Sequence, residues 1–189
     1  MSRAVPPTAS RLIVRRDGKA ITGKVPKPVI LTDTREQSPL DLARFKNWIA
    51  GQRVATLPTG DYTVEGMEGV VCMERKSLPD LVGTLMHNRQ RFFREMERMQ
   101  EFQYRCILVE ASYEDVKSPY SFTTDVQAHP NGVSGSLDAL EVKFGVPIIY
   151  SSQNRDLVEE KAASWLSKTF TYWWLETNGL GRVLQDGDL

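Results

Sequence analysis

Two acidic residues and a lysine are spaced so that a β-hairpin would bring them together. Asp61 stands at the start of one predicted strand, and Glu74 and Lys76 stand at the end of the next. Because opposite ends of a hairpin meet, the two carboxylates should converge, and they would then repel each other. Mg²⁺ or Mn²⁺ relieves such repulsion, since both ions favour oxygen ligands and retain waters or phosphate in their shell. This spacing therefore predicts a metal site.

Lys76 and Asp33 extend the predicted site. Lys76 lies two residues beyond Glu74 on the same strand, so its side chain should point to the same face. A lysine there can orient or help deprotonate an attacking water, and it can neutralise charge on a phosphoryl group. Asp33 ends the first predicted strand and would add a third carboxylate if that strand lay beside the hairpin. An acid followed by Glu-x-Lys is a weak pattern on its own.

The elements that must position these residues follow from hydrophobic periodicity. Apolar runs bounded by turn residues predict strands at 29–31, 54–57, 61–64, 70–75, 106–109 and 146–150. Helical spacing predicts helices at 40–50, 78–85, 88–103 and 156–176, and another through Leu137, Leu140 and Phe144 that Gly145 ends. Residues 112–132 are expected to be irregular. This order of elements predicts an α/β fold with a mixed central sheet flanked by helices.

The motif residues together resemble the signature of a nuclease family. Gly60-Asp61-Tyr62, then Glu74-Arg75-Lys76, then Asp80 resemble the motif of the XPF/Hef-type nucleases, structure-specific endonucleases of excision repair and fork processing. Asp33-Thr34-Arg35-Glu36 resembles the upstream Asp-x-Arg-Glu element of that family, and 80–85 with Arg89 matches its downstream helix and arginine. The resemblance covers about residues 29–176 and implies a restriction-endonuclease-like core.

The resemblance also implies roles for individual side chains. Asp61, Glu74 and Asp33 would bind Mg²⁺ or Mn²⁺, and the carbonyl of Arg75 could add a ligand. Lys76 would be the catalytic lysine. The full catalytic set that it implies is Asp33, Glu36, Asp61, Glu74, Arg75, Lys76 and Asp80. Arg89 would contact the DNA backbone, and the other arginines expected to contact DNA are Arg35, Arg91 and Arg94.

Several of these residues have a structural alternative. Asp80 could simply complete a capping box with Ser77, and Glu36 could be no more than a charge at a helix N-terminus. Arg75 could pair with a neighbouring carboxylate as a structural contact. A further set of arginines could form a DNA-facing stripe or an ordinary solvated face, since glutamates alternate with them. These arginines are Arg91, Arg94, Arg98 and Arg105, and the glutamates are Glu95, Glu97 and Glu101.

Length and charge predict one domain with flanking segments. The chain has 189 residues, and a domain takes roughly 150. Residues 1–28 hold seven basic side chains against one acidic side chain, so the neutral chain divides into a +6 leader and a −6 remainder. The basic leader, expected to be flexible, could neutralise phosphates or could serve solubility alone. Residues 29–176 are the predicted nuclease domain, and 177–189 form a tail.

Other features of the chain bear on its location. No run approaches 18 apolar residues, which excludes a membrane span, and the N-terminus lacks the apolar core of a signal peptide. We therefore expect an intracellular protein, in the cytoplasm or nucleoid if bacterial or phage and in the nucleus if eukaryotic. Cys72 and Cys106 are expected to be reduced, buried thiols. The cysteines and histidines are too scattered for a zinc site.

The last predicted helix is unusually aromatic. Five rings fall within ten residues: Trp165, Phe170, Tyr172, Trp173 and Trp174. They could pack into the core, or some could stay exposed and form an interface. The family resemblance implies the second use, because XPF-type nuclease domains pair through their C-terminal helices, as homodimers or with an inactive partner protein.

The function expected from the motifs is a metal-dependent, structure-specific DNA endonuclease that hydrolyses a phosphodiester in branched, flap or fork DNA. Two alternatives stay open: a general or Holliday-junction-type nuclease on the same core, and a non-catalytic DNA-binding partner. Residues 177–189 are too few for the tandem helix–hairpin–helix module that most XPF-type enzymes carry after the nuclease domain. The preferred DNA structure is therefore left open, as are the flap polarity, the number of metals and any protein partner.

Overall fold

The computed structural model describes residues 14–16, 19–21, 25–122 and 128–178. Within the predicted leader, β1 (Val14–Arg16) and β2 (Lys19–Ile21) pair as a two-stranded antiparallel sheet. The rest of the leader up to residue 24, and the tail beyond residue 178, lie outside the described residues.

A six-stranded mixed sheet forms the centre of the fold, as predicted. Its strands are β3 (Val29–Asp33), β4 (Gly51–Ala55), β5 (Tyr62–Val64), β6 (Val71–Ser77), β7 (Tyr104–Glu110) and β8 (Ile148–Tyr150). The spatial order is β4-β3-β5-β6-β7-β8. Strand β5 is antiparallel to both of its neighbours, whereas β3–β4, β6–β7 and β7–β8 are parallel pairs. The hairpin that carries the predicted site therefore lies in the middle of the sheet.

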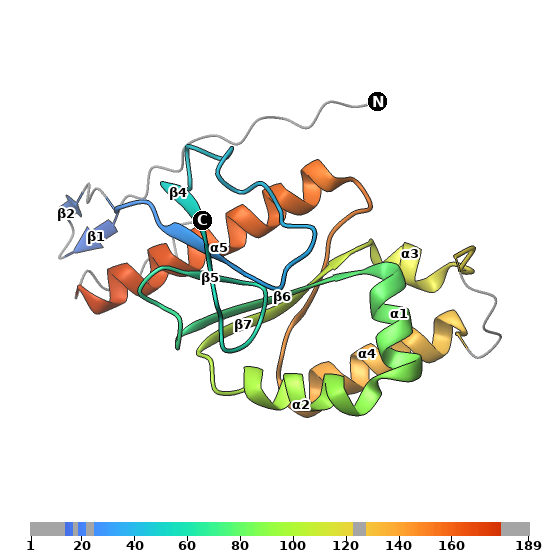
Figure 1. Cartoon of the computed structure of the whole chain (residues 1–189). Helices are drawn as coiled ribbons and strands as arrows, with labels where there is room; N and C mark the ends of the chain where they lie inside the picture. Colours follow the sequence, from blue (N-terminus) through green and yellow to red (C-terminus); the bar gives the residue numbers. More distant parts are fainter. Residues whose placement is uncertain (1–13, 17–18, 22–24, 123–127, 179–189) are drawn as a thin grey trace.

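Helices cover both faces of this sheet (Figure 1). They are α1 (Leu78–His87), α2 (Arg89–Met99), α3 (Tyr113–Lys117), α4 (Pro130–Phe144) and α5 (Arg155–Thr177). Strand β7 shows the division: Ile107 and Val109 pack with α1, α2 and α4, whereas Cys106 and Leu108 pack with α5. Successive strand residues point to opposite faces, and both faces of β7 are buried, so the run is continuously apolar.

The helix predicted at 40–50 is wrong, because this segment folds as successive turns. Its apolar residues are buried as expected, including Leu42, Phe45 and Ile49. The side chain of Gln52 accepts hydrogen bonds from the amides of Leu42 and Ala43, at 2.9 and 3.2 Å. Within the segment, turn bonds replace a helix ladder: the amide of Phe45 donates to the carbonyl of Leu42 at 3.1 Å, and that of Trp48 donates to the carbonyl of Phe45 at 2.8 Å. Apolar spacing therefore identified the buried residues but not the backbone conformation.

The stretch expected to be irregular at 112–132 is more ordered than predicted. Ser112 and Asp115 form a reciprocal capping box that begins α3, and α4 begins at Pro130. Helix α4 ends at Gly145, whose φ of 60° lies in the left-handed region that glycine tolerates. Both cysteines are free and buried, as expected. No helix among the described residues is long and apolar enough to cross a membrane.

Candidate active site

The β5–β6 hairpin brings the predicted acids together. The amide of Asp61 donates to the carbonyl of Met73 at 2.9 Å, and the amide of Arg75 donates to Oδ2 of Asp61 at 2.8 Å. The Asp61 carboxylate therefore lies beside the strand segment that carries Glu74 and Lys76. The convergence inferred from the spacing is confirmed.

Gly60 makes the close approach of the two strands possible. Its φ is 79°, and a Cβ atom there would lie 2.6 Å from Sγ of Cys72 and 3.1 Å from the carbonyl oxygen of Met73. A side chain at this position would force the segment before Asp61 away from β6. Glycine is thus required both for the backbone conformation and for the contact.

Asp33 lies next to the hairpin but is already well bonded. Its amide donates to the carbonyl of Asp61 at 2.8 Å, which places β3 beside the site as expected. Its carboxylate, 2% exposed, accepts from Nε of Arg35 at 2.6 Å and from the amide of Leu57 at 2.7 Å. The hydrogen bond from the Arg35 side chain is the main cause that lowers the pKa of Asp33. These contacts make Asp33 an anchor between β3 and the segment after β4.

Glu74 and Lys76 form a buried ion pair. Nζ of Lys76 contacts Oε1 of Glu74, and the Glu74 side chain is 6% exposed. Burial and then the charge of Asp61 raise the pKa of Glu74 well above its ordinary value. Burial raises the pKa of Asp61 to about 6, although the hydrogen bond from the Arg75 amide opposes it. Both acids therefore hold their charge at an energetic cost.

Lys76 is held in its protonated form. Burial lowers the pKa of Lys76, but the charges of Glu74 and Glu95 outweigh burial and raise the pKa above its ordinary value. Oδ2 of Asp80 lies 3.8 Å and Oε2 of Glu95 lies 3.9 Å from Nζ of Lys76. Asp80 therefore fits both a supporting role in the site and a role in the cap of α1, where its amide donates to Oγ of Ser77.

A cavity of about 350 Å³ opens over these groups. The sheet contributes Asp33, Glu74 and Lys76, and the loop before β5 contributes residues 58–61. The opposite wall comes from the α1–α2 region, and its residues are Asp80, Thr84, Asn88, Arg91, Phe92, Glu95 and Arg98. Arg35 completes the rim.

One residue of this wall, Glu95, was not expected in the site, because its charge fits a solvated helix face. Arg98 lines the cavity with Arg91, so two members of the possible arginine stripe face the site. Both share a helix face with Arg91, since they follow it by four and seven residues. That spacing was the available signal.

Three other arginines, Arg89 and the stripe members Arg94 and Arg105, lie outside the cavity lining. Arg89 and Arg94 are exposed, and the guanidinium of Arg89 stands over the ring of Phe93. Arg105 donates to the carbonyls of Phe102 and Gly145, at 2.7 and 3.1 Å, and acts as a structural tie.

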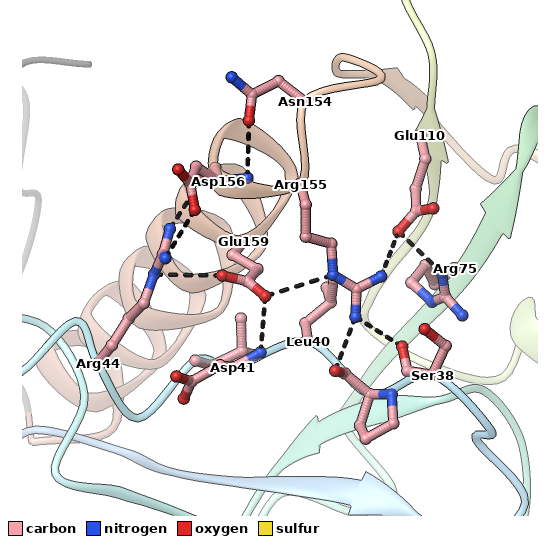
Figure 2. Close-up of polar contacts among 12 residues, drawn as sticks. Ser38, Leu40, Asp41, Arg44, Arg75, Glu110, Asn154, Arg155, Asp156 and Glu159 are labelled. Atoms are coloured by element: carbon pink, nitrogen blue, oxygen red, sulfur yellow. Dashed lines mark hydrogen bonds and ion pairs between the residues drawn. The ribbon is translucent and has the colours of Figure 1, made fainter. Parts of the chain in front are cut away.

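Arg75 and Glu36 pair behind the site. Glu36 accepts from Nε and Nη2 of Arg75, at 2.9 and 2.8 Å, and its side chain is 6% exposed. Nη1 of Arg75 donates to Glu110 at 2.8 Å (Figure 2). No helix begins at Glu36, so the alternative of a helix N-terminal charge is wrong. Arg75 instead joins β6 to the loop after β3 and to the end of β7.

Two residues, Asp61 and Glu74, are the best candidates to bind a metal ion. Within the described ranges, no three Asp, Glu, His or Cys side chains are grouped closely enough to hold an ion. Asp61 and Glu74 fit a divalent cation, because burial and proximity leave their negative charge poorly compensated. Mg²⁺ commonly uses one or two carboxylates and completes its shell with water and phosphate.

Comparison with known proteins gives a family match. A model of the ERCC4 domain matches residues 32–162. The solved structure of XPF from Aeropyrum pernix is similar over 79% of this chain and 72% of its own, at 18% identity and a TM-score of 0.57. XPF from Aeropyrum pernix in complex with DNA is similar over 77% of this chain and 66% of its own, at 20% identity and a TM-score of 0.57.

The search of curated sequences gave no match. At these identities the two solved structures show the fold, and the family follows from the matched domain, which spans more than half of the chain. The chain belongs to the ERCC4-domain family of XPF nucleases.

Proposed function

We propose that this protein is a metal-dependent, structure-specific DNA endonuclease that hydrolyses a phosphodiester in branched, flap or fork DNA. The observation that carries this proposal is the convergence of Asp61, Glu74 and Lys76 in one cavity with arginines at its rim. Membership of the ERCC4-domain family supports the same reaction class. A site that acts on DNA would work in the cytoplasm or nucleoid, or in a nucleus.

Each group of the cavity has a part in this reaction. Asp61 and Glu74 would hold Mg²⁺ or Mn²⁺, which supplies an activated water and polarises a phosphoryl oxygen. The raised pKa of Lys76 favours its ammonium form, so Lys76 would orient that water and neutralise charge on the phosphoryl group. Attack at phosphorus would break the P–O3′ bond and leave a 5′-phosphate and a 3′-hydroxyl.

The arginines would hold the DNA backbone over the cavity. Arg91 and Arg98 project from α2, and Arg35 lies across the opening beside Asp33. Arginine suits phosphate because its planar donors can bind two oxygens at once. Arg89 and Arg94 could contact more distant phosphates, and the basic leader could add further ones.

The decisive experiment is cleavage of labelled linear, flap, fork and four-way DNA, with Mg²⁺ and with chelator. Wild type should cut branched substrates faster than linear ones, and chelator should stop cleavage. Glu74→Ala and Lys76→Ala should each lower the rate by at least about a hundredfold. Wild-type rates in both variants would remove the catalytic assignment. Equal rates on linear and branched DNA would favour a general nuclease, and a preference for four-way DNA would favour a Holliday-junction enzyme. Binding without cleavage would favour a DNA-binding scaffold.

Helix α5 also supports a homodimer as part of the proposal. Trp165, Phe170 and Trp173 are partly buried against the core on the α5 side, and Tyr172 is 38% exposed. This aromatic face could pair with a second copy or with another protein. Light scattering should give the mass of a dimer for wild type and a lower average mass for Trp173→Ala. A monomer mass for both would remove the dimer.

A further inference from the structure

The first turn of α5 is tied to the loop that follows β3 (Figure 2). Nη2 of Arg155 donates to the carbonyls of Ser38 and Pro39, both at 2.7 Å. Nε of Arg155 donates to Glu159 at 3.3 Å, and Glu159 accepts the amide of Asp41 at 3.0 Å. Arg155 therefore holds the loop at consecutive backbone positions.

The same guanidinium reaches the residues around Arg75. Nη1 of Arg155 donates to Oε1 of Glu110 at 3.2 Å, and that oxygen also accepts from Nη1 of Arg75 at 2.8 Å. The remaining donors of Arg75 bind Glu36, whose Oε1 accepts the amide of Ser38 at 2.8 Å. These five residues form a closed ring that starts and ends at Arg155.

Removing one member should shift the others. Two arginines and two glutamates balance in charge, and the Arg75, Glu36 and Glu110 side chains are 12, 6 and 16% exposed. Without Arg155, the ring keeps two carboxylates and one guanidinium in a partly desolvated place. Arg75 would then be the only cation of the ring, and the loop would lose its hold on α5.

A shift of Arg75 would move the acids that are proposed to bind the metal. Its backbone amide binds Asp61, and its neighbours along β6 are Glu74 and Lys76. We propose that Arg155 is a positioning residue of the nuclease site, which acts through Glu110 and Arg75 to set the geometry of Asp61 and Glu74. This inference rests on the proposed function. Arg155 itself lies outside the residues that line the cavity.

Arg44 provides a matched control. Its side chain is 39% exposed and that of Arg155 is 38% exposed. Arg44 also binds the first turns of α5, through Asp156 at 2.8 Å and Glu159 at 3.2 Å. Its described contacts do not include Glu110 or residues 36–39. Arg44→Gln therefore removes a similar tie to α5 and leaves the ring intact.

The test measures Mn²⁺ binding by titration calorimetry and single-turnover cleavage of a flap substrate, on the full chain. Arg155→Gln should weaken Mn²⁺ affinity and slow cleavage at saturating DNA by about tenfold or more, with DNA affinity unchanged within about twofold. Arg155→Lys should recover part of both losses, since it keeps the charge with fewer fixed donors. Arg44→Gln should stay within about twofold of wild type.

Glu110→Gln perturbs the ring from β7 and covers the case in which Arg155→Gln does not fold. Glu110→Gln should reproduce the loss of Mn²⁺ affinity. The double variant Arg155→Gln/Glu110→Gln should bind Mn²⁺ no more weakly than the single variant with the lower affinity, because both substitutions break the same ring.

Two outcomes overturn the inference while the proposed function stands. One is wild-type Mn²⁺ affinity and cleavage in folded Arg155→Gln or in Glu110→Gln. The other is equal losses in Arg155→Gln and Arg44→Gln, which would show that Arg155 only anchors a helix. A wild-type chain that neither binds Mn²⁺ nor cleaves DNA would instead overturn the proposed function, and this inference with it.

Discussion

The ammonium of Lys76 contacts the carboxylate of Glu74, two residues away on the same buried strand. One lysine thus faces Glu74 and Glu95, and Asp61 lies across the hairpin. Burial raises the pKa of Asp61 and of Glu74, although the charge of Lys76 acts to lower both. A divalent cation would remove the remaining repulsion, so the metal-free site should be a source of instability.

This imbalance predicts how stability depends on pH without metal. Asp61 has an ordinary pKa of 3.8 and a folded-state pKa of about 6. Between these values the folded chain binds more protons than the unfolded chain, so the free energy of unfolding falls as pH rises. The pKa of Glu74 is raised too and acts in the same direction. Ionisation of Asp61 should make the free energy of unfolding about 1 to 3 kcal/mol lower at pH 8 than at pH 4.

Asp61→Asn isolates this effect from the other carboxylates. Urea denaturation with chelator, from pH 4.5 to 8, should show that the free energy of unfolding of wild type falls relative to that of Asp61→Asn. Addition of Mn²⁺ at pH 8 should stabilise wild type and leave Asp61→Asn unchanged. A wild type that gains stability relative to the variant as pH rises would contradict the raised pKa.

Asp33→Asn tests whether Asp33 is an anchor or a metal ligand. The substitution removes the ion pair with Arg35. Each carboxylate oxygen accepts two hydrogen bonds from donors of Arg35 or Leu57, so the NH₂ group of the new asparagine would face donors in either orientation. The free energy of unfolding should fall by about 2 to 4 kcal/mol, as measured by urea denaturation. Mn²⁺ affinity, measured where the variant is folded, should fall much less than in Asp61→Asn. A stable variant that has lost Mn²⁺ binding would make Asp33 a ligand.

The hairpin chemistry was predictable because it depends on short spacings. The hairpin geometry places Asp61 beside the end of β6. The alternation of side chains along a strand places Lys76 on the same face as Glu74. Most strands and helices could be predicted for the same local reason. Segment 40–50 could not, because several of its amides bond to side chains outside it: those of Tyr62, Glu159 and Gln52.

The parts of the site that escaped prediction depend on distant pairs. Arg75 and Glu36 are separated by 39 residues, and Arg75 and Glu110 by 35 residues. No periodicity indicates which of several glutamates will face an arginine across the fold. The role of α2 was predictable in kind, but which arginines face the cavity depends on how the helix is rotated against β6.

Gly60→Ala should disturb both stability and metal binding. An added Cβ would lie 2.6 Å from Sγ of Cys72, and the alanine would have to adopt the positive φ of Gly60. Gly66→Ala is the matched control, because Gly66 has a φ of 82° but open space around a Cβ. Urea denaturation should show a loss of about 1 kcal/mol in Gly66→Ala from the backbone alone. Gly60→Ala should lose a further 1 to 3 kcal/mol, roughly, from the contact.

The metal response separates these glycines further. Gly60 precedes Asp61, so Gly60→Ala should weaken Mn²⁺ binding in titration calorimetry, whereas Gly66→Ala should not. Equal effects of the two substitutions on both measurements would mean that the contact with Cys72 does not constrain the site.

Arg98 and Arg94 separate the cavity-facing side of α2 from its other exposed surface. Both are exposed arginines on one helix, but only Arg98 is among the described residues that line the cavity, where its Nε lies 3.4 Å from Oγ1 of Thr59. If DNA lies over the cavity, Arg98→Ala should lower the affinity for flap DNA by about fivefold or more and reduce the salt dependence by about one phosphate contact. Arg94→Ala should change both quantities less than Arg98→Ala, because Arg94 lies outside the cavity lining and could reach only a more distant phosphate. Fluorescence anisotropy at several salt concentrations, with Ca²⁺ in place of Mg²⁺ to limit cleavage, measures both. A larger loss in Arg94→Ala would place the DNA backbone on the other side of α2.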